Sequence, residues 1–293
     1  MLFAGACATC ALAWRGAFDD VFFAERAAII YATGGDTTNY TEGGTNFQAH
    51  IFTNIGATNF VVVAENLCCD VLVVAGGGCG GQNDRGGGGG GAGGLIYTSL
   101  VVEAGAYAVG IGKSGEVWGE KGSNSNFGDL EAYGGGQGAN GYDLSYNGGP
   151  GASGGGAGHG SVVGGACTNG QGNIGGAGNS GSKHFGGGGG GGWGSAGGNA
   201  ESSTNGHAGN GGEGFTTAIS GEERTYSAGG GGGCQHGTTF YTAGLGGDGV
   251  GGDGGSETDG MDAVFYGSGG GGAGLVNDPG KGFQGCVIVR YIL

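Results

Sequence analysis

Residues 148–160 read GGPGASGGGAGHG, and the size of the side chain in this segment follows a three-residue period. Two positions of each triplet hold only glycine or alanine. The larger side chains all take the third position, at Pro150, Ser153 and His159. Because an extended left-handed helix has three residues per turn, this segment would offer two bare faces to its neighbours. The pattern predicts close packing on those two faces and exposure of the third.

Segments of the same kind recur through most of the chain. Glycine accounts for 88 of 293 residues, against roughly 7% in ordinary proteins. Each glycine held in regular structure costs roughly 0.5–1 kcal/mol more than alanine, so its use here needs a compensation that only glycine permits. Close backbone approach, with N–H···O and Cα–H···O bonds between segments, supplies one and predicts a bundle of polyglycine II helices. The tracts are 76–94, 134–141, 148–160, 186–198, 228–233, 244–255 and 267–274.

Two other glycine-rich or low-complexity classes do not fit this composition. Collagen needs an unbroken G-X-Y register and many prolines, whereas this chain has 2 prolines. Disordered chains are highly charged and poor in aromatic and β-branched residues. Here 11% of the residues are charged, 9% are aromatic and 37% are hydrophobic. We therefore expect an ordered protein.

Strand-like segments stand at both ends of the glycine-rich region. Runs of β-branched and aromatic residues between turn residues predict strands at 47–52, 59–64, 70–75, 95–102, 107–112 and 286–293. The last of these must pair with the early strands, so the glycine-rich stretch is predicted to be an insertion whose two ends meet at one base. The predicted fold class is all-β, with a small antiparallel β-sandwich as the base and a polyglycine II bundle built on it.

This organisation divides the chain into three regions. Residues 1–34 form an N-terminal docking or assembly segment, whose aromatic spacing suggests a short helical stripe. Packing of this segment onto the base is the alternative. Residues 35–115 form the β-rich base, and residues 116–293 form the bundle, closed by the C-terminal strand at 286–292.

The net charge and the sequence motifs argue against several classes of function. The formal net charge of −15 leaves no basic surface for nucleic acid or anionic membranes, and no apolar run is long enough for a transmembrane helix. G-x-G-x-x-G strings recur through composition alone, because no helix follows any of them as a dinucleotide site requires. No nucleophile, base and acid stand in a catalytic pattern. The chain is therefore predicted not to be an enzyme.

Metal and cofactor sites are not predicted. The eight cysteines contain one C-x-x-C pair, at Cys7 and Cys10, and a second is missing, so scattered buried thiols are the simpler interpretation. The stretch GGDGVGGDGG at 246–255 is similar to a calcium-binding repeat, but its acidic spacing differs and it occurs once. Calcium remains the alternative there to solvated acidic turn residues.

Several motifs in sequential order carry a resemblance to a known group of proteins. They are DVLVVAGGG (70–78), GGGGAGGLIY (88–97), YAVGIGKSG (107–115), GSNSNFGD (122–129) and CVIVRY (286–291). Over about residues 34–293 the chain resembles the glycine-rich domains of bacteriophage tail-fibre and adhesin proteins and related surface proteins. It departs from them at Cys68–Cys69 and at CGGQNDRG (79–86). The resemblance implies a rigid polyglycine bundle whose distal loops bind a host receptor.

The resemblance also implies where recognition would take place. Aromatic residues beside glycine give a rigid contact surface at low entropy cost, and the breaks between tracts supply them. The alternative interpretation is that these rings plug the ends of the bundle. The candidate receptor-binding residues are Tyr142, Tyr146, His184, Phe185, Trp193, Phe240, Tyr241, Phe265 and Tyr266.

Together these points predict a non-enzymatic protein of a virion or extracellular surface, a tail-fibre or adhesin component. Its expected partners are other virion or filament subunits, held through the N-terminal segment, and a host-surface glycan or protein. An oligomer is expected. The alternative is a purely structural building block of a filament, capsid, sheath or cell wall. Ice binding is a third interpretation, for which the repeated threonine face is missing.

Overall fold

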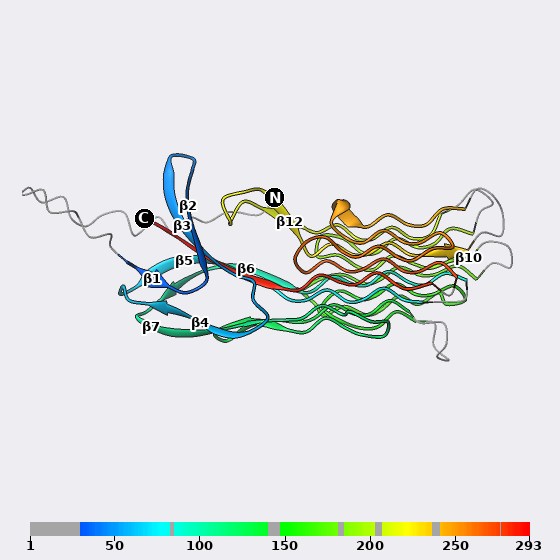
Figure 1. Cartoon of the computed structure of the whole chain (residues 1–293), viewed down its shortest axis with the longest axis horizontal. Helices are drawn as coiled ribbons and strands as arrows, with labels where there is room; N and C mark the ends of the chain where they lie inside the picture. The colour runs from blue at the N-terminus through cyan, green and yellow to red at the C-terminus, as the bar shows by residue number, and fades with distance from the viewer. Residues whose placement is uncertain are drawn as a thin grey trace, which may run out of the picture.

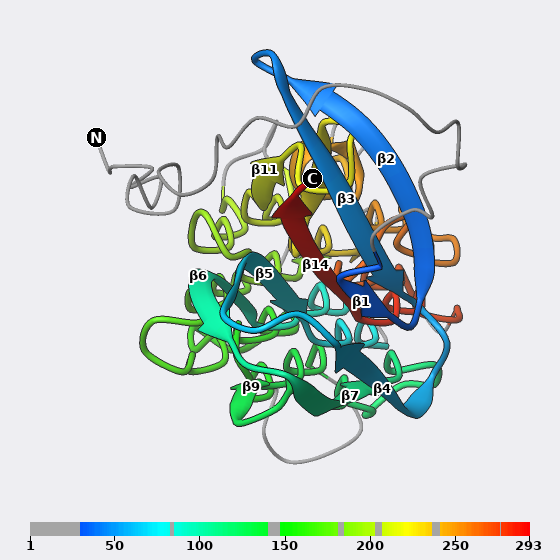
Figure 2. The same ribbon diagram turned by 90° about the vertical axis from the view of Figure 1, so that its left-hand side faces the viewer.

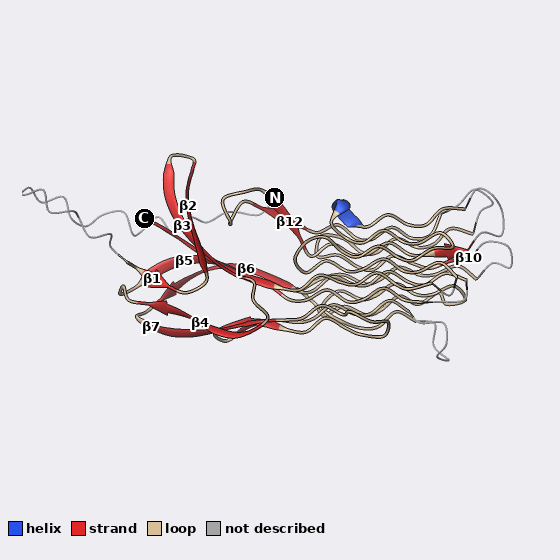
Figure 3. Ribbon diagram, in the orientation of Figure 1, coloured by secondary structure: helices blue, strands red, loops and turns tan. Residues whose placement is uncertain are grey.

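The computed structural model shows an elongated molecule with two parts (Figure 1). A strand-rich base lies at one end and a bundle of long extended segments at the other, and Figure 3 shows that the bundle contains almost no regular strand. Most of the predicted N-terminal docking segment, with its helical stripe, falls in 1–29 and so lies outside the described residues. The structure describes residues 30–82, 85–139, 147–180, 185–202, 207–235, 241–275 and 277–293.

The base is a sandwich of two five-stranded antiparallel sheets. The first sheet has the order β1 (Ala32–Thr33), β4 (Gly56–Val62), β7 (Gly105–Ile111), β8 (Ser125–Phe127) and β9 (Leu130–Ala132). The second has the order β2 (Asp36–Glu42), β3 (Thr45–Phe52), β14 (Cys286–Ile292), β5 (Leu67–Val74) and β6 (Leu95–Val102).

All six predicted strands are confirmed, with bounds that differ by a few residues. The C-terminal strand β14 lies between β3 and β5, with Ile288 opposite Ile51 on one side and Leu72 on the other. The prediction that the last strand pairs with early ones is therefore confirmed. The sequence prediction lacked β2, which reads DTTNYTE and is polar because it forms an exposed edge.

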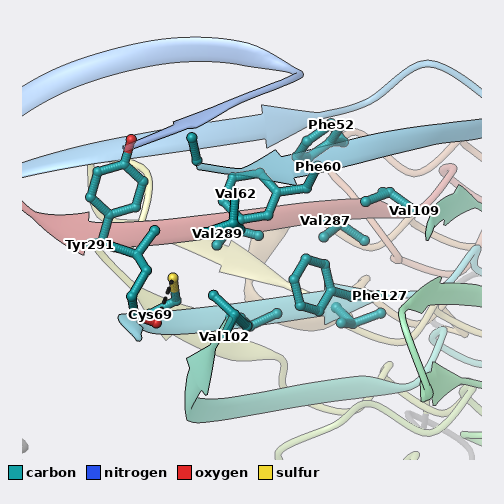
Figure 4. Packing of buried hydrophobic residues seen from close by; sticks show 14 of the residues in the cluster. Phe52, Phe60, Val62, Cys69, Val102, Val109, Phe127, Val287, Val289 and Tyr291 are labelled. Carbon is teal, nitrogen blue, oxygen red and sulfur yellow. Dashed lines mark hydrogen bonds between the residues drawn. The ribbon is translucent and has the colours of Figure 1, made fainter. Parts of the chain in front are cut away.

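The core between the two sheets is apolar and contributed by both (Figure 4). Phe60, on β4, is fully buried and packs edge-on against Phe52 at a ring-centroid distance of 6.3 Å. Val71 and Val289 are also fully buried, on adjacent strands of the other sheet. The outer face of that second sheet is buried too where the β11–β12 hairpin (Phe215–Thr217, Arg224–Tyr226) covers it, with Ile219 at 0% exposure.

Hydrogen bonds in the bundle repeat every third residue, as a three-residue screw requires. Successive N–H groups from Gly89 to Gly94 donate to three different neighbours in turn, so each neighbour receives every third N–H. One neighbour runs antiparallel, in the pairs Gly87–Ala273, Gly90–Gly270 and Gly93–Gly267, with N···O distances of 2.9, 2.8 and 2.7 Å. Another runs parallel, in the pairs Gly89–Gly188 and Ala92–Gly191. Figure 2 shows the segments nearly end-on, as small coils behind the sheets.

Glycine is required in these segments because neighbouring backbones fill the space of a side chain. A Cβ added at Gly90 would lie 2.2 Å from the carbonyl oxygen of Gly78, and one at Gly190 would lie 1.9 Å from that of Gly90. Positive φ angles occur at turn glycines such as Gly160 and Gly267, and Gly90 and Gly190 are not among them. The bundle therefore has the polyglycine II arrangement that the three-residue pattern predicts.

One expectation from that pattern is wrong. Of the larger residues on the third face of 148–160, Pro150 is exposed, but Ser153 is 0% and His159 is 5% exposed. The segment has neighbours on more sides than two: the Ser153 N–H donates to Ala92 O, the Ser153 carbonyl accepts from Gly136 N–H, and the Gly154 N–H donates to a third segment at Asn173 O. Position in the bundle, rather than the size of the side chain, decides which face is covered.

Base and bundle interleave along the chain. Segment 76–94 lies in the bundle although it precedes residue 115, and β8 and β9 lie in the base although they follow it. The chain passes repeatedly from one part to the other, so a single boundary at residue 115 does not describe the arrangement. No helix in the described ranges has the length and apolar character needed to cross a membrane.

Candidate recognition site at the far end of the bundle

The end of the bundle opposite the base carries a small ladder between two short strands. There β10 (Phe185–Gly186) pairs antiparallel with β13 (Cys234–Gln235), at the right of Figure 1. Side chains from several turns meet beside this ladder, and we call them the far-end cluster. Its members are Arg85, His159, Asn179, Phe185, Glu201, His207 and Tyr241.

Asn179 is the centre of the far-end cluster. Its side-chain NH₂ donates to the hydroxyl of Tyr241 (2.8 Å) and to the carbonyl of Glu201 (2.7 Å). Its Oδ1 accepts from the Gly186 N–H at 3.1 Å. At 3% exposure, this amide joins three segments of chain, because an asparagine offers two donors and one oxygen acceptor.

The same network fixes the tautomer of His159. Its Nδ1 lies 2.8 Å from Asn179 Oδ1, an acceptor, so Nδ1 carries the hydrogen. The neutral ring then presents Nε2 as an acceptor, and Arg85 Nη1 lies 3.5 Å from it. His159 thereby connects the buried amide to an exposed cation at the surface.

Tyr241, one of the predicted receptor-binding residues, is 0% exposed. Its hydroxyl donates towards the carbonyls of Glu201 (2.7 Å) and His207 (3.2 Å), and burial raises the pKa of this hydroxyl above its usual value. This position corresponds to the alternative interpretation, a ring that plugs the end of the bundle.

Among the predicted residues that the structure describes, Phe185 is the one that reaches the surface at the far-end cluster. Its ring is half-buried, with the guanidinium of Arg85 5.0 Å from its centroid and His159 edge-on at 4.9 Å. A cation over an aromatic face is attractive and holds both groups in place. Arg85 was not among the predicted residues, although it lies in the inserted CGGQNDRG, the stretch that departs from the pattern.

Three other predicted residues lie away from the far end, at the junction of bundle and base. Trp193 donates its indole N–H to Leu95 O at 3.2 Å, and Phe265 and Tyr266 pack on the second sheet. All three are half-buried. They contribute to the apolar layer that joins the two parts. Four predicted residues lie outside the described residues: Tyr142, Tyr146, His184 and Phe240.

The acidic side chains of 246–255 bind backbone in this structure. Asp248 accepts from Gly214 N–H and Asp253 accepts from Gly246 N–H, each at 2.7 Å. This arrangement fits acidic turn residues that complete the outer hydrogen bonds of the bundle, the simpler of the two sequence interpretations. Across the described parts of the chain, no group of three or more His, Cys, Asp or Glu side chains could hold a metal ion.

Comparison with known protein families identifies the group to which the chain belongs. The sequence model of the family described as a glycine-rich domain matches residues 53–292. No curated protein matches the chain. The matched range includes β4 to β14 and the whole bundle, so it covers the far-end cluster and the base apart from β1, β2 and β3.

Proposed function

This chain belongs to the glycine-rich domain family, and from that premise we propose that it is a non-enzymatic component of a virion or extracellular surface. In this proposal it acts as a tail-fibre or adhesin subunit. The N-terminal segment holds it to other subunits, and the far end of the bundle binds a glycan or protein of the host surface.

The observation that carries the proposal is the separation of the two ends. The described chain begins at Ile30 in the base, beside β1, and the far-end cluster lies at the other end of the bundle (Figure 1). A molecule attached through its N-terminal segment would therefore present the far end outward. The glycine segments suit this role because their backbones are tied to several neighbours each.

Within the far end, the surface pair Arg85 and Phe185 is the part suited to contact a receptor. Arginine and aromatic residues dominate the energetics of many recognition surfaces. This pair is held from below by His159 and Asn179, so its geometry is fixed before a receptor arrives. Fixed geometry lowers the entropy cost of binding.

A non-enzymatic role agrees with the state of the thiols. Cys69 and Cys79 are fully buried or nearly so, and burial raises the pKa of each thiol to about 12. The thiolate is the nucleophilic form of cysteine, so these two side chains are inert at neutral pH.

A binding assay with the labelled full chain tests the receptor role. The probe is a printed array of host-type surface glycans, followed by intact cells of the source organism and its hosts. Arg85→Ala and Phe185→Ala should each reduce binding at least tenfold. The matched control is Arg224→Ala, because Arg224 also lies over a phenylalanine, Phe265 at 5.7 Å, but at the base. Equal binding by all four proteins would contradict the proposal.

Localisation is tested separately by immunogold electron microscopy with an antibody to the full chain. Labelling of particle fibres or of a cell surface is expected. Labelling confined to the cell interior would contradict the surface assignment, whatever the binding assay shows.

A structural role is the second candidate, and one observation favours it. The surface of the bundle carries apolar residues that are more than half exposed, which suits packing of one bundle against another. They include Val162, Ile174, Leu245, Met261 and Val264. Electron microscopy of the purified chain separates the two functions, because fibres that form without any cell or glycan binding would favour the building block.

A further inference from the structure

The strand β6 is a long sheet edge without a charged residue. Each sheet ends in two edge strands, and three of the four are short or charged: β1 has 2 residues, β9 has 3, and β2 carries Asp36 and Glu42. In contrast, β6 reads LIYTSLVV over 8 residues. Figure 2 shows it at the side of the base, next to β5. Proteins usually protect such an edge with charge, proline or a bulge, and β6 has neither a charge nor a proline.

The pairing with β5 decides which backbone groups of β6 point outward. The bond from Ala75 N–H to Gly94 O (2.9 Å) makes these residues a hydrogen-bonded pair that continues into the β5–β6 ladder. Hydrogen-bonded pairs alternate along an antiparallel ladder. The even-numbered residues of β6 therefore bond to β5, and the N–H and C=O groups of the odd-numbered residues face away from it.

The outward groups of β6 are mostly without a protein partner in the described parts of the chain. At the start of the strand, Leu95 O accepts the indole N–H of Trp193 at 3.2 Å, as expected for an outward carbonyl. Beyond that point, no hydrogen bond from the outer edge of β6 to another described residue is present at Tyr97, Ser99 or Val101. Three consecutive odd positions thus offer both a donor and an acceptor.

We propose that this edge is the contact through which two copies of the chain form a symmetric dimer, with β6 paired antiparallel to β6 of the second copy. The register that satisfies the outward groups is centred on Ser99. In this register Ser99 pairs with Ser99 of the second copy, and Tyr97 pairs with Val101 of the second copy. Every outward N–H and C=O of these three residues then finds a partner.

The register also matches side chains on both faces. On the outer face, Tyr97 (40% exposed) meets Val101 of the second copy (58% exposed), an aromatic and β-branched pair of the kind that stabilises sheets. On the inner face, Thr98 meets Leu100, and Ile96 meets Val102, of the second copy. A shift by one residue would place apolar inner residues opposite outer ones. A shift by two keeps the faces matched but leaves Tyr97 or Val101 without one of the other outward residues opposite it, so the register centred on Ser99 is the one that pairs all three.

The absence of charge at the β6 edge favours a second copy of the chain as its partner. A chain with a formal charge of −15 repels itself over most of its surface, and two copies approach best where charge is absent. The β6 edge is such a place, and a two-fold axis through Ser99 makes it complementary to itself, as an isologous contact must be. The carboxylate beside Ser99, that of Asp70, accepts from Ser99 Oγ at 2.6 Å and is bound by Arg290 Nε at 3.0 Å.

The dimer has a defined shape. Gly94, the last bundle residue before β6, lies at the Leu95 end of the strand, so antiparallel pairing sends the two bundles in opposite directions. Both bases, with the two Ile30 positions, lie at the centre. One attachment point would therefore carry two far-end clusters, one at each tip. This consequence goes beyond the proposed receptor role and does not depend on it.

Mass measurement in solution tests the contact. Analytical ultracentrifugation of the full chain over the micromolar range should show a reversible monomer–dimer equilibrium, as expected for a small interface. Val101→Pro removes an outward N–H without touching the β5 ladder, a position where proline is tolerated, and should weaken the dimer at least tenfold. Val101→Ala is the matched control, because it keeps the N–H and should still dimerise. Thermal melting of both variants establishes that they are folded.

A cross-link tests the register. Ser99→Cys places two thiols directly opposite one another, within the Cα separation that a disulfide spans, and mild oxidation should yield a reducible dimer. In Val101→Cys the two thiols would be displaced by four residues along the strand, roughly 13 Å, and should not react. The unmodified chain, oxidised in parallel, accounts for the native cysteines. A monomer at all concentrations, a trimer or filament, or a dimer indifferent to Val101→Pro would each overturn the proposal.

Discussion

Replacing Gly190 by alanine tests whether the bundle is held by close backbone contact. Gly190 is buried, and its N–H donates to Gly230 O at 2.8 Å. An added Cβ would lie 1.9 Å from Gly90 O, which accepts from Gly230 N–H at 2.9 Å. That carbonyl must retreat by roughly 1 Å or more, because the contact is far inside van der Waals distance. The retreat stretches its hydrogen bond beyond the usual range.

The expected cost follows from these contacts. Disrupting this buried hydrogen bond leaves two groups, Gly90 O and Gly230 N–H, without a partner, at about 1–3 kcal/mol for each buried group. The lower chain entropy of alanine in the unfolded state returns about 0.4–1 kcal/mol. The net loss is about 2–5 kcal/mol, a large part of an ordinary stability of about 5–15 kcal/mol.

Urea unfolding followed by tryptophan fluorescence measures this loss, since Trp193 lies in the same segment at the junction with the base. Gly198→Ala is the matched control: its Cβ would meet Asn210 N at 3.0 Å, which a small shift relieves. We expect its cost to stay below about 1 kcal/mol. Equal losses for the two variants, or no loss at Gly190, would refute the close-contact account.

Three further predictions concern the base and the far end. Arg290→Met should destabilise the base by about 1–3 kcal/mol, because Arg290 (side chain 14% exposed) bonds to Asp70 and Glu42. Urea unfolding measures this loss, and an unchanged midpoint would contradict it. Burial lowers the pKa of His50 below its usual value. The folded chain then binds fewer protons than the unfolded one, so stability should fall as the pH drops below about 6.5, and His50→Gln should flatten that dependence in thermal melts. Asn179→Ala should speed amide exchange at Gly186 while leaving β14 protected, because it opens the far end only; uniform exchange changes would argue against a local role.

The strands and the three-residue screw could be predicted from sequence because each depends on local pattern. Strand β14 reads CVIVRYI, a run of β-branched and aromatic residues that is typical of a buried strand. Because such a strand must pair with others, it predicted that the two ends of the glycine-rich stretch meet in the base. The strand β2 was not predicted because it is an exposed sheet edge. Its residues are polar and lack the apolar run by which a core strand is recognised.

The arrangement of segments in the bundle could not be predicted, because glycine carries no side chain that selects a neighbour. The burial of Ser153 and His159 depends on how many segments surround 148–160, and composition does not contain that number. The far-end cluster was missed for a related reason: Arg85, His159 and Asn179 are far apart in sequence and meet through turns of separate segments. Phe185 and Tyr241 were identified by residue type alone, which does not separate a surface ring from a buried one.

The three-residue screw imposes a counting rule on how this sequence can change in length. One residue inserted in a bundle segment turns every later N–H by a third of a turn, away from its acceptor and towards a different neighbour. Three inserted residues restore the direction and only lengthen the segment by about 9 Å. Changes in length inside the bundle are therefore expected to survive in multiples of three, with compensating triplets in the adjoining segments, whereas the turns at the far end are free to vary by single residues.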